Sequence, residues 1–167
     1  LNVKLIKYAR ETNNRMPLHM LDLVQDGLRE IGKAVEKSSI TILGLAYKDL
    51  TDDTRNSVAL PIVTRLKEMG AKITVYDPYV LDVKMFGDIR KAESLMESIK
   101  GADCVVLVTN HAEFKCLNLK EMAKLLNPPA VIVDGRHLFN PRDVIATGIA
   151  FRGVGRYVKY VKQEEMA

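Results

Sequence analysis

Short apolar runs alternate with stretches of helical periodicity after residue 38, and this alternation limits the chain to few folds. The apolar runs are predicted to be strands at 40–43, 73–76, 104–108, 130–133 and 149–154. The segments between them are predicted to be helices at 57–69, 92–100, 118–126 and from 140 onward. Strand–helix–strand order gives parallel strands joined by crossover helices. The sequence therefore predicts an α/β fold, a parallel sheet with flanking helices, in which 149–154 is an edge strand.

The first 38 residues follow a different pattern, with one apolar stripe along a predicted helix. The stripe residues recur at spacings of three and four, and they are Leu21, Val24, Leu28, Ile31 and Val35. Pro17 is expected to begin or bend this helix, which should run to about Lys37 before Ser38 breaks the pattern. We therefore predict a boundary between 1–38 and 39–167. An unpaired stripe would favour a homodimer through this helix, although the helix could instead fold back on its own domain.

Composition excludes several classes of protein. With 167 residues and 47% hydrophobic content, the chain can bury one substantial core but not two full domains. Its apolar stretches fall well short of the ~20 residues that a membrane span needs, so we expect no membrane association. The net charge of +4 is spread along the chain, with a locally basic tail at Arg152, Arg156, Lys159 and Lys162. Since nucleic-acid motifs are lacking and few aromatic residues could stack on bases, we expect no nucleic-acid partner.

The two cysteines indicate neither catalysis nor metal binding. Cys104 lies inside an apolar run, where burial would raise the pKa of its thiol, and Cys116 has no neighbour that would activate it. Neither belongs to a CxxC pair or lies among grouped histidines, so we predict no disulfide framework and no metal site. A reducing cytoplasm is the expected location. Because residues 1–10 contain no initiator methionine, we also expect the chain to come from the middle of a longer protein.

The residues that follow the predicted strands are the candidates for ligand binding, because ligands of open parallel sheets lie beyond the carboxyl ends of the strands. After the first strand, Gly44 would let the backbone approach a ligand, and Lys48 would supply a positive charge. Together with the amino terminus of the following helix, this arrangement suits a phosphate. The alternative is that Lys48 is a solvated loop charge and that Arg55 pairs with Asp52 or Asp53.

The later strand ends each leave two interpretations open. Asp77 could bind a ribose, or it could simply end its strand. Arg136 lies beside a glycine and suits bidentate contact with a phosphate or carboxylate, but it could also form a surface pair with Asp134. His111 follows the third strand and could act as an acid or base. Because no nucleophile or metal partner accompanies His111 in the sequence, we expect it to be a polar surface residue.

Six segments together resemble the carboxyl-terminal third of the UDP-glucose and UDP-N-acetylmannosamine dehydrogenase family. In order, they are ARETNNRMP, ILGLAYK, DDTRNS, VYDPYV, ADCVVLVTNHAEF and VIVDGR. The resemblance implies a Rossmann-like UDP-sugar-binding domain over 39–167. Residues 1–38 would then be a remnant of the helical central domain, which forms the dimer interface in such enzymes. The resemblance also implies that Tyr47, Lys48 and Arg136 contact a UDP-sugar substrate.

The family oxidises the C6 alcohol of the sugar to a carboxylate, using two molecules of NAD and a cysteine-bound thioester. By the same resemblance, Arg55 would reach the NAD diphosphate, while most of NAD would be bound by an amino-terminal domain upstream of these residues. The nucleophilic cysteine would also lie upstream, so no catalytic residue is carried over and the isolated chain is expected to be inactive. ARETNNRMP and GLAYK favour enzymes of UDP-N-acetylmannosamine over those of UDP-glucose. The alternatives are a free-standing nucleotide-sugar-binding or regulatory module and a purely structural dimerisation piece.

Overall fold

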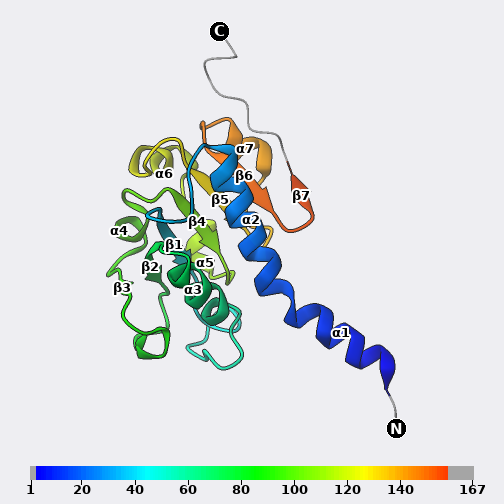
Figure 1. Ribbon diagram of the computed structural model, residues 1–167. Coiled ribbons are helices and arrows are strands. Elements are labelled where there is room, and N and C mark those ends of the chain that lie inside the picture. Colours follow the sequence, from blue (N-terminus) through cyan, green and yellow to red (C-terminus); the bar gives the residue numbers. More distant parts are fainter. Residues whose placement is uncertain (1–2, 158–167) are drawn as a thin grey trace.

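A seven-stranded sheet forms the centre of the structure, a computed structural model that describes residues 3–157 (Figure 1). The strands lie in the order β3-β2-β1-β4-β5-β6-β7. Their bounds are β1 Ser39–Leu43, β2 Lys72–Tyr76, β3 Arg90–Lys91, β4 Cys104–Leu107, β5 Val131–Asp134, β6 Ala150–Gly153 and β7 Arg156–Tyr157. Neighbouring strands are parallel except for β6 and β7, which are antiparallel. The predicted α/β fold with a mostly parallel sheet is confirmed.

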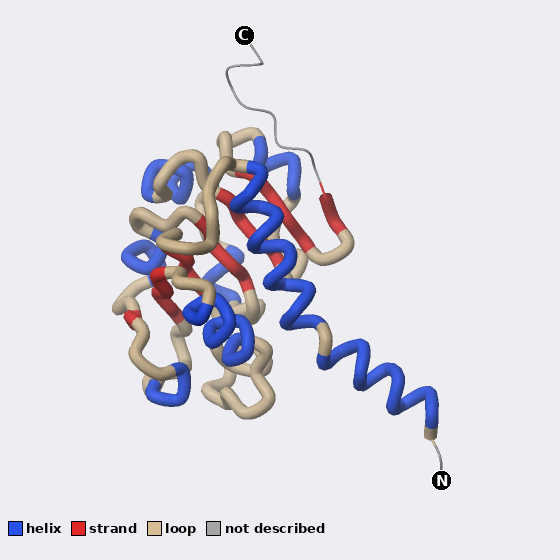
Figure 2. Tube along the Cα trace, viewed as in Figure 1, coloured by secondary structure: helices blue, strands red, loops and turns tan. Residues whose placement is uncertain are grey.

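Helices cover both faces of this sheet, as crossover connections require. They are α1 Lys4–Asn14, α2 Met16–Glu30, α3 Ala59–Glu68, η1 Lys84–Phe86, α4 Leu95–Ile99, α5 Ala112–Lys115, α6 Leu119–Leu125 and α7 Pro141–Ile145. Side chains of α2 and α3 pack on one face with strand residues such as Ile42 and Val106. Those of α4 to α7 pack with the alternate strand residues, such as Leu43 and Val105, so the strands lie between two helical layers (Figure 2). Within residues 3–157, no helix has both the length and the apolar character to cross a membrane.

The amino-terminal segment forms two helices, not the one helix that was predicted to reach Lys37. Arg15 separates α1 from α2, and α2 ends at Glu30. The apolar stripe from Leu21 to Val35 is buried in the core of its own chain, which is the alternative in which the helix folds back. This stripe is therefore not free to meet a second chain. By contrast, α1 has no buried residue and projects away from the sheet (Figure 1).

A buried arginine fastens α2 to the sheet. Arg152 of β6 is buried, and its guanidinium donates hydrogen bonds to Asp26 at 2.9 Å and to Glu30 at 2.7 Å. The sequence predicted that Arg152 is part of a locally basic tail. Because these two carboxylates neutralise its charge, Arg152 does not contribute to a basic surface. The tail lysines of that prediction, Lys159 and Lys162, lie outside the described residues.

The two edges of the sheet differ from the prediction. The segment 149–154 was predicted to be an edge strand, but β6 lies between β5 and β7, and β7 covers it as an antiparallel partner. The strand at the other edge of the sheet, β3, contains two residues. Strands of two residues carry no periodicity, so the sequence could not predict β3 or β7.

The helix predicted over 92–100 is shorter in the structure. Ser94 accepts a hydrogen bond from the Glu97 N–H and caps α4 at its beginning.

Candidate functional site

The carboxyl ends of β1, β4 and β5 meet where the strand order reverses, which is where doubly wound sheets bind ligands. Gly44 directly follows β1 and has a φ of +90°. A Cβ atom at this position would lie 2.5 Å from Cβ and 2.6 Å from the backbone nitrogen of Thr109, which follows β4. Glycine is thus required here because the loop packs tightly on the end of β4. This reason differs from the predicted one, which was the approach of a ligand to the backbone.

A buried carboxylate holds the loop after β1. Asp77 Oδ2 accepts hydrogen bonds from the backbone N–H groups of Leu45 at 2.6 Å and Ala46 at 3.0 Å. Asp77 Oδ1 accepts two more from Tyr79 and Val80. Burial alone would raise the pKa of Asp77, but the hydrogen bonds from His111 and from the backbone lower it to about 2. Because Asp77 accepts the N–H groups of Leu45 and Ala46, these two groups are not free to cradle a phosphate.

His111 is buried against this carboxylate, which contradicts its predicted place on the surface. The side chains of His111 and Asp77 are both 0% exposed, and His111 Nε2 lies 2.9 Å from Asp77 Oδ2. The other ring nitrogen, Nδ1, lies 3.4 Å from the backbone nitrogen of Leu50. The sequence signal that could have found this pair is the position of both residues at the ends of strands that flank β1.

Two adjoining clefts lie between the α1–α2 junction and the strand ends. One, of about 600 Å³, is lined by Arg10, Asn13, Asn14, Pro17, Tyr47, Asn56, Ser57, Val58 and Pro61. The other, of about 220 Å³, is lined by Asn13, Met16, Met20, Val58, Leu107, Val108, Gly135, Arg136 and Val154. Asn13 and Val58 line both clefts, so the clefts are neighbours. The structure thus brings together Tyr47 and Arg136, and it adds the polar residues Arg10 and Asn13, which sequence reasoning did not select.

Two of the predicted ligand-binding residues do not line these clefts: Lys48, expected to contact the UDP-sugar, and Arg55, expected to contact NAD. Both are exposed, and Lys48 directly follows Tyr47. Arg55 Nε and Nη2 donate to the two carboxylate oxygens of Asp53, each at 2.9 Å. This is the pairing that the sequence offered as the alternative. The hydrogen bonds from Arg55 lower the pKa of Asp53 to about 2.

Arg136 is free to face a ligand, because its predicted surface partner is buried and engaged elsewhere. Asp134 is fully buried, and its Oδ1 accepts a hydrogen bond from the backbone N–H of Arg136, not from the guanidinium. Asp134 Oδ2 forms an ion pair with Arg156 at 3.0 Å. At Gly135 a Cβ atom would lie 2.8 Å from Met20 Cε, so the loop that carries Arg136 packs directly on α2.

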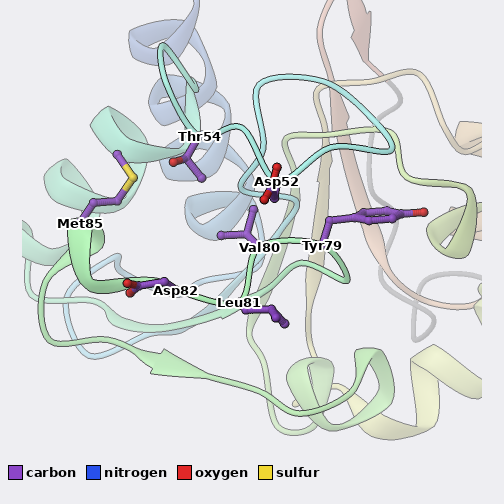
Figure 3. A pocket seen from close by; sticks show the side chains of 7 residues that line it. All are labelled: Asp52, Thr54, Tyr79, Val80, Leu81, Asp82 and Met85. Atoms are coloured by element: carbon purple, nitrogen blue, oxygen red, sulfur yellow. The ribbon is translucent and has the colours of Figure 1, made fainter.

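A third cleft, of about 450 Å³, lies between residues 52–54 and the segment that follows β2 (Figure 3). Its lining residues are Asp52, Thr54, Tyr79, Val80, Leu81, Asp82 and Met85, and none of them lines the other two clefts. In Figure 3 the Tyr79 ring extends away from the side that holds Thr54 and Met85. Because its charged residues are Asp52 and Asp82, this cleft disfavours a phosphate group.

The described residues offer no activated thiol and no metal centre. Burial raises the pKa of the Cys104 thiol, which makes it a poor nucleophile. Cys116 is exposed, and its Sγ atom lies 3.9 Å from the carbonyl oxygen of Ala112. No group of three potential metal-ligating side chains occurs within residues 3–157.

Parallel strands in this order, with polar side chains gathered at the reversal point, define a Rossmann-like nucleotide-binding domain. Residues 41–141 match the UDP binding domain of the UDP-glucose/GDP-mannose dehydrogenase family. Because this match covers more than half of the chain, the chain belongs to that family. The resemblance inferred from the six sequence segments is confirmed.

Known proteins similar to the chain agree with this assignment. It is 37% identical to a UDP-N-acetyl-D-mannosamine dehydrogenase of Pyrococcus horikoshii, over 91% of this chain and 34% of that protein. It is 31% identical to the UDP-glucose 6-dehydrogenase TuaD of Bacillus subtilis, over 92% of this chain and 33% of that protein. A crystal structure of an NDP-N-acetyl-D-galactosaminuronic acid dehydrogenase from Methanosarcina mazei superimposes with a TM-score of 0.83 and 30% identity, covering 90% of this chain and 31% of that one. The chain therefore spans about a third of the length of these relatives.

Proposed function

We propose that this chain binds a UDP-sugar in the two adjoining clefts, as one part of a UDP-sugar 6-dehydrogenase. The observation that supports this most strongly is that the cleft lined by Tyr47 and the cleft lined by Arg136 share Asn13 and Val58 and are therefore neighbours. A groove of several hundred cubic ångströms with a few convergent polar groups is the size that a nucleotide-sized ligand needs.

In this proposal, side chains hold the diphosphate of the ligand. The loop N–H groups of Leu45 and Ala46 already bond to Asp77, so these two groups are not available to an anion. Arg136 supplies a guanidinium that can bind phosphate oxygens in a bidentate way, and Lys48 supplies a mobile ammonium beside Tyr47. Arg10 and Asn13 face the same groove from α1 and add a charge and an amide.

The parent enzyme would use NAD, but these residues do not fit most of that cofactor. A dinucleotide cradle needs a glycine-rich loop with free backbone N–H groups, whereas the loop after β1 contains one glycine and gives its N–H groups to Asp77. We therefore infer that NAD is bound mainly by a segment outside this chain. Arg55 gives Nε and Nη2 to Asp53, and this exposed pair is weak enough for the guanidinium to turn toward the NAD diphosphate at little cost.

The sugar that we propose is N-acetylmannosamine, because the Pyrococcus relative acts on UDP-N-acetyl-D-mannosamine according to its name.

We also propose that the protein is a homodimer in the cytoplasm. Its interface would be α1, where Leu5, Ile6 and Tyr8 are exposed, rather than the buried stripe of α2. Sedimentation that shows only a monomer at high protein concentration would exclude this interface.

Calorimetric titration with UDP, GDP and NAD tests the proposed function. We expect UDP to bind more tightly than GDP, and NAD to bind weakly or not at all. Equal affinity for UDP and GDP would contradict the assignment of the nucleotide. The absence of any nucleotide binding would favour a purely structural role for this chain.

A further inference from the structure

The loop that carries Tyr47 and Lys48 is held from inside the protein at three backbone positions. Asp77 Oδ2 accepts hydrogen bonds from the N–H groups of residues 45 and 46, just before Tyr47. His111 Nδ1 accepts a hydrogen bond from the N–H of Leu50, two residues after Lys48. Tyr47, which lines the larger cleft, and its exposed neighbour Lys48 thus lie between hydrogen bonds to one buried pair. We call residues 44–50 the ligand loop.

The contacts of His111 determine which ring nitrogen carries the proton. A backbone N–H can only donate, so Nδ1, which faces Leu50, must be the unprotonated acceptor. The proton therefore sits on Nε2, which donates to Asp77 Oδ2 at 2.9 Å. A second proton on the ring would place one donor against another at Leu50 and would remove the acceptor that holds the loop there.

We propose that Asp77 and His111 are positioning residues for UDP-sugar binding, which shape the ligand loop while His111 is neutral and do not touch the ligand themselves. Both side chains are 0% exposed, and neither lines any of the three clefts. This inference rests on the proposed function, because it assumes that Tyr47 and Lys48 meet the nucleotide sugar.

The groups that face the His111 ring come from the segment after β2, from α5 and from the ligand loop. Asp77, from the end of β2, stays ionised because its pKa is about 2. The rings of Tyr79 and Phe114 lie 5.0 Å and 5.4 Å from the His111 ring, centroid to centroid. Beyond Phe114, the Tyr76 hydroxyl donates to Glu113 of α5, and burial together with this contact raises the pKa of Tyr76 to about 12. On the ligand loop, Lys48 and Asp49 are exposed.

The experiment compares the unchanged chain with His111→Gln, and with His19→Gln as the matched control at an exposed histidine of α2. Glutamine can still donate an N–H to Asp77, but it cannot titrate and it offers no acceptor at the Nδ1 position. Affinity for UDP-N-acetylmannosamine is measured by calorimetry from pH 8 down to the pH at which the His111 ring is protonated. Nitrogen NMR follows that protonation, and amide hydrogen exchange follows Leu50. The diphosphate of this ligand is a diester and does not titrate in the range.

We expect His111→Gln to bind ~3- to 10-fold more weakly at pH 8, the loss of about one hydrogen bond, and to show no further pH dependence. The unchanged chain and His19→Gln should weaken by a similar factor as the ring gains its proton, with faster exchange at Leu50. The inference is overturned if His111→Gln binds as the unchanged chain does, or if affinity stays constant while the ring protonates. If no variant binds at pH 8, the proposed function fails. The tautomer of the His111 ring and the hydrogen exchange of the Leu50 amide then still test whether His111 holds the ligand loop.

Discussion

Arg152 and Glu30 form a buried ion pair across the α2–sheet interface, with Arg152 Nη1 donating to Glu30 Oε2 at 2.7 Å. The Arg152 guanidinium also lies 4.6 Å from the centroid of the Tyr157 ring. This side chain therefore connects α2, β6 and β7, although α2 lies far from the two strands in the sequence. Because α2 and the strand ends line the same clefts, the pair also supports the geometry of the proposed site.

Removing this arginine should destabilise the chain. We expect Arg152→Ala to lower the free energy of unfolding by about 3 kcal/mol, since it removes the buried guanidinium that neutralises the carboxylates of Asp26 and Glu30. Urea denaturation measures the loss. The matched control is Arg29→Ala, whose exposed pair with Asp26 spans 3.7 Å and should contribute less than about 1 kcal/mol. Equal effects of the two substitutions would contradict this account of the interface.

Gly44→Ala tests whether the ligand loop needs close packing as well as a left-handed backbone. Gly101→Ala is the control, because Gly101 also has a positive φ but a Cβ atom there would meet no neighbouring atom within 4 Å. We expect the control to cost about 1–2 kcal/mol for the backbone conformation alone. Gly44→Ala should cost about 1–3 kcal/mol more, because its Cβ would overlap Thr109. Thermal or urea unfolding of both variants gives the comparison.

Stability should fall in acid as Asp77 takes up a proton. Its pKa is lowered from 3.8 to about 2, so the folded state gains stability above the unfolded pKa of about 4. That contribution, about 2 kcal/mol, is lost as the pH falls from 4 through 2. Urea unfolding at pH 5 and pH 2 should therefore show a smaller acid loss in Asp77→Asn than in the unchanged chain. The same loss in both would exclude Asp77 as a source of the acid sensitivity.

The positions of the buried strands along the chain could be predicted from the sequence, because continuous apolar runs such as 104–108 are typical of strands buried on both faces of a parallel sheet. β1, β2, β4 and β5 accordingly lie within one residue of their predicted bounds. The end of α2 could not be predicted in the same way. Ile31 and Val35 continue the helical spacing but reach the core from a turn and loop after Glu30.

Residues that line the clefts could be selected from the sequence only where they lie in the loops that follow strands. Tyr47 lies in the loop after β1 and Arg136 in the loop after β5, and each lines one of the two adjoining clefts. Asn13 lies on a helix without buried residues, and nothing local indicates that this helix passes the strand ends. The surface position predicted for His111 was wrong for a related reason: its partner, Asp77, precedes it by 34 residues and becomes its neighbour only when the strands are placed in order.

The isolated chain should not oxidise a UDP-sugar. Thioester formation needs an activated thiolate, whereas burial raises the pKa of the Cys104 thiol and the Cys116 thiol lies against the backbone carbonyl oxygen of Ala112. The assay is NADH production from UDP-N-acetylmannosamine and from UDP-glucose, run beside a Cys104→Ser, Cys116→Ser double variant. We expect no turnover by either protein. Turnover that disappears in the double variant would show that one of these cysteines is the nucleophile.

The most direct test of the central claim is UDP titration of Arg136→Ala and Lys48→Ala, with Arg55→Ala as the matched control. Loss of a charge-assisted contact to the diphosphate should weaken UDP binding by about 1.5–3 kcal/mol in each of the first two variants. Arg55→Ala should bind UDP almost as the unchanged chain does, because its proposed partner is NAD. Equal UDP affinity in all four proteins would contradict the assignment of Arg136 and Lys48 to the nucleotide-sugar site.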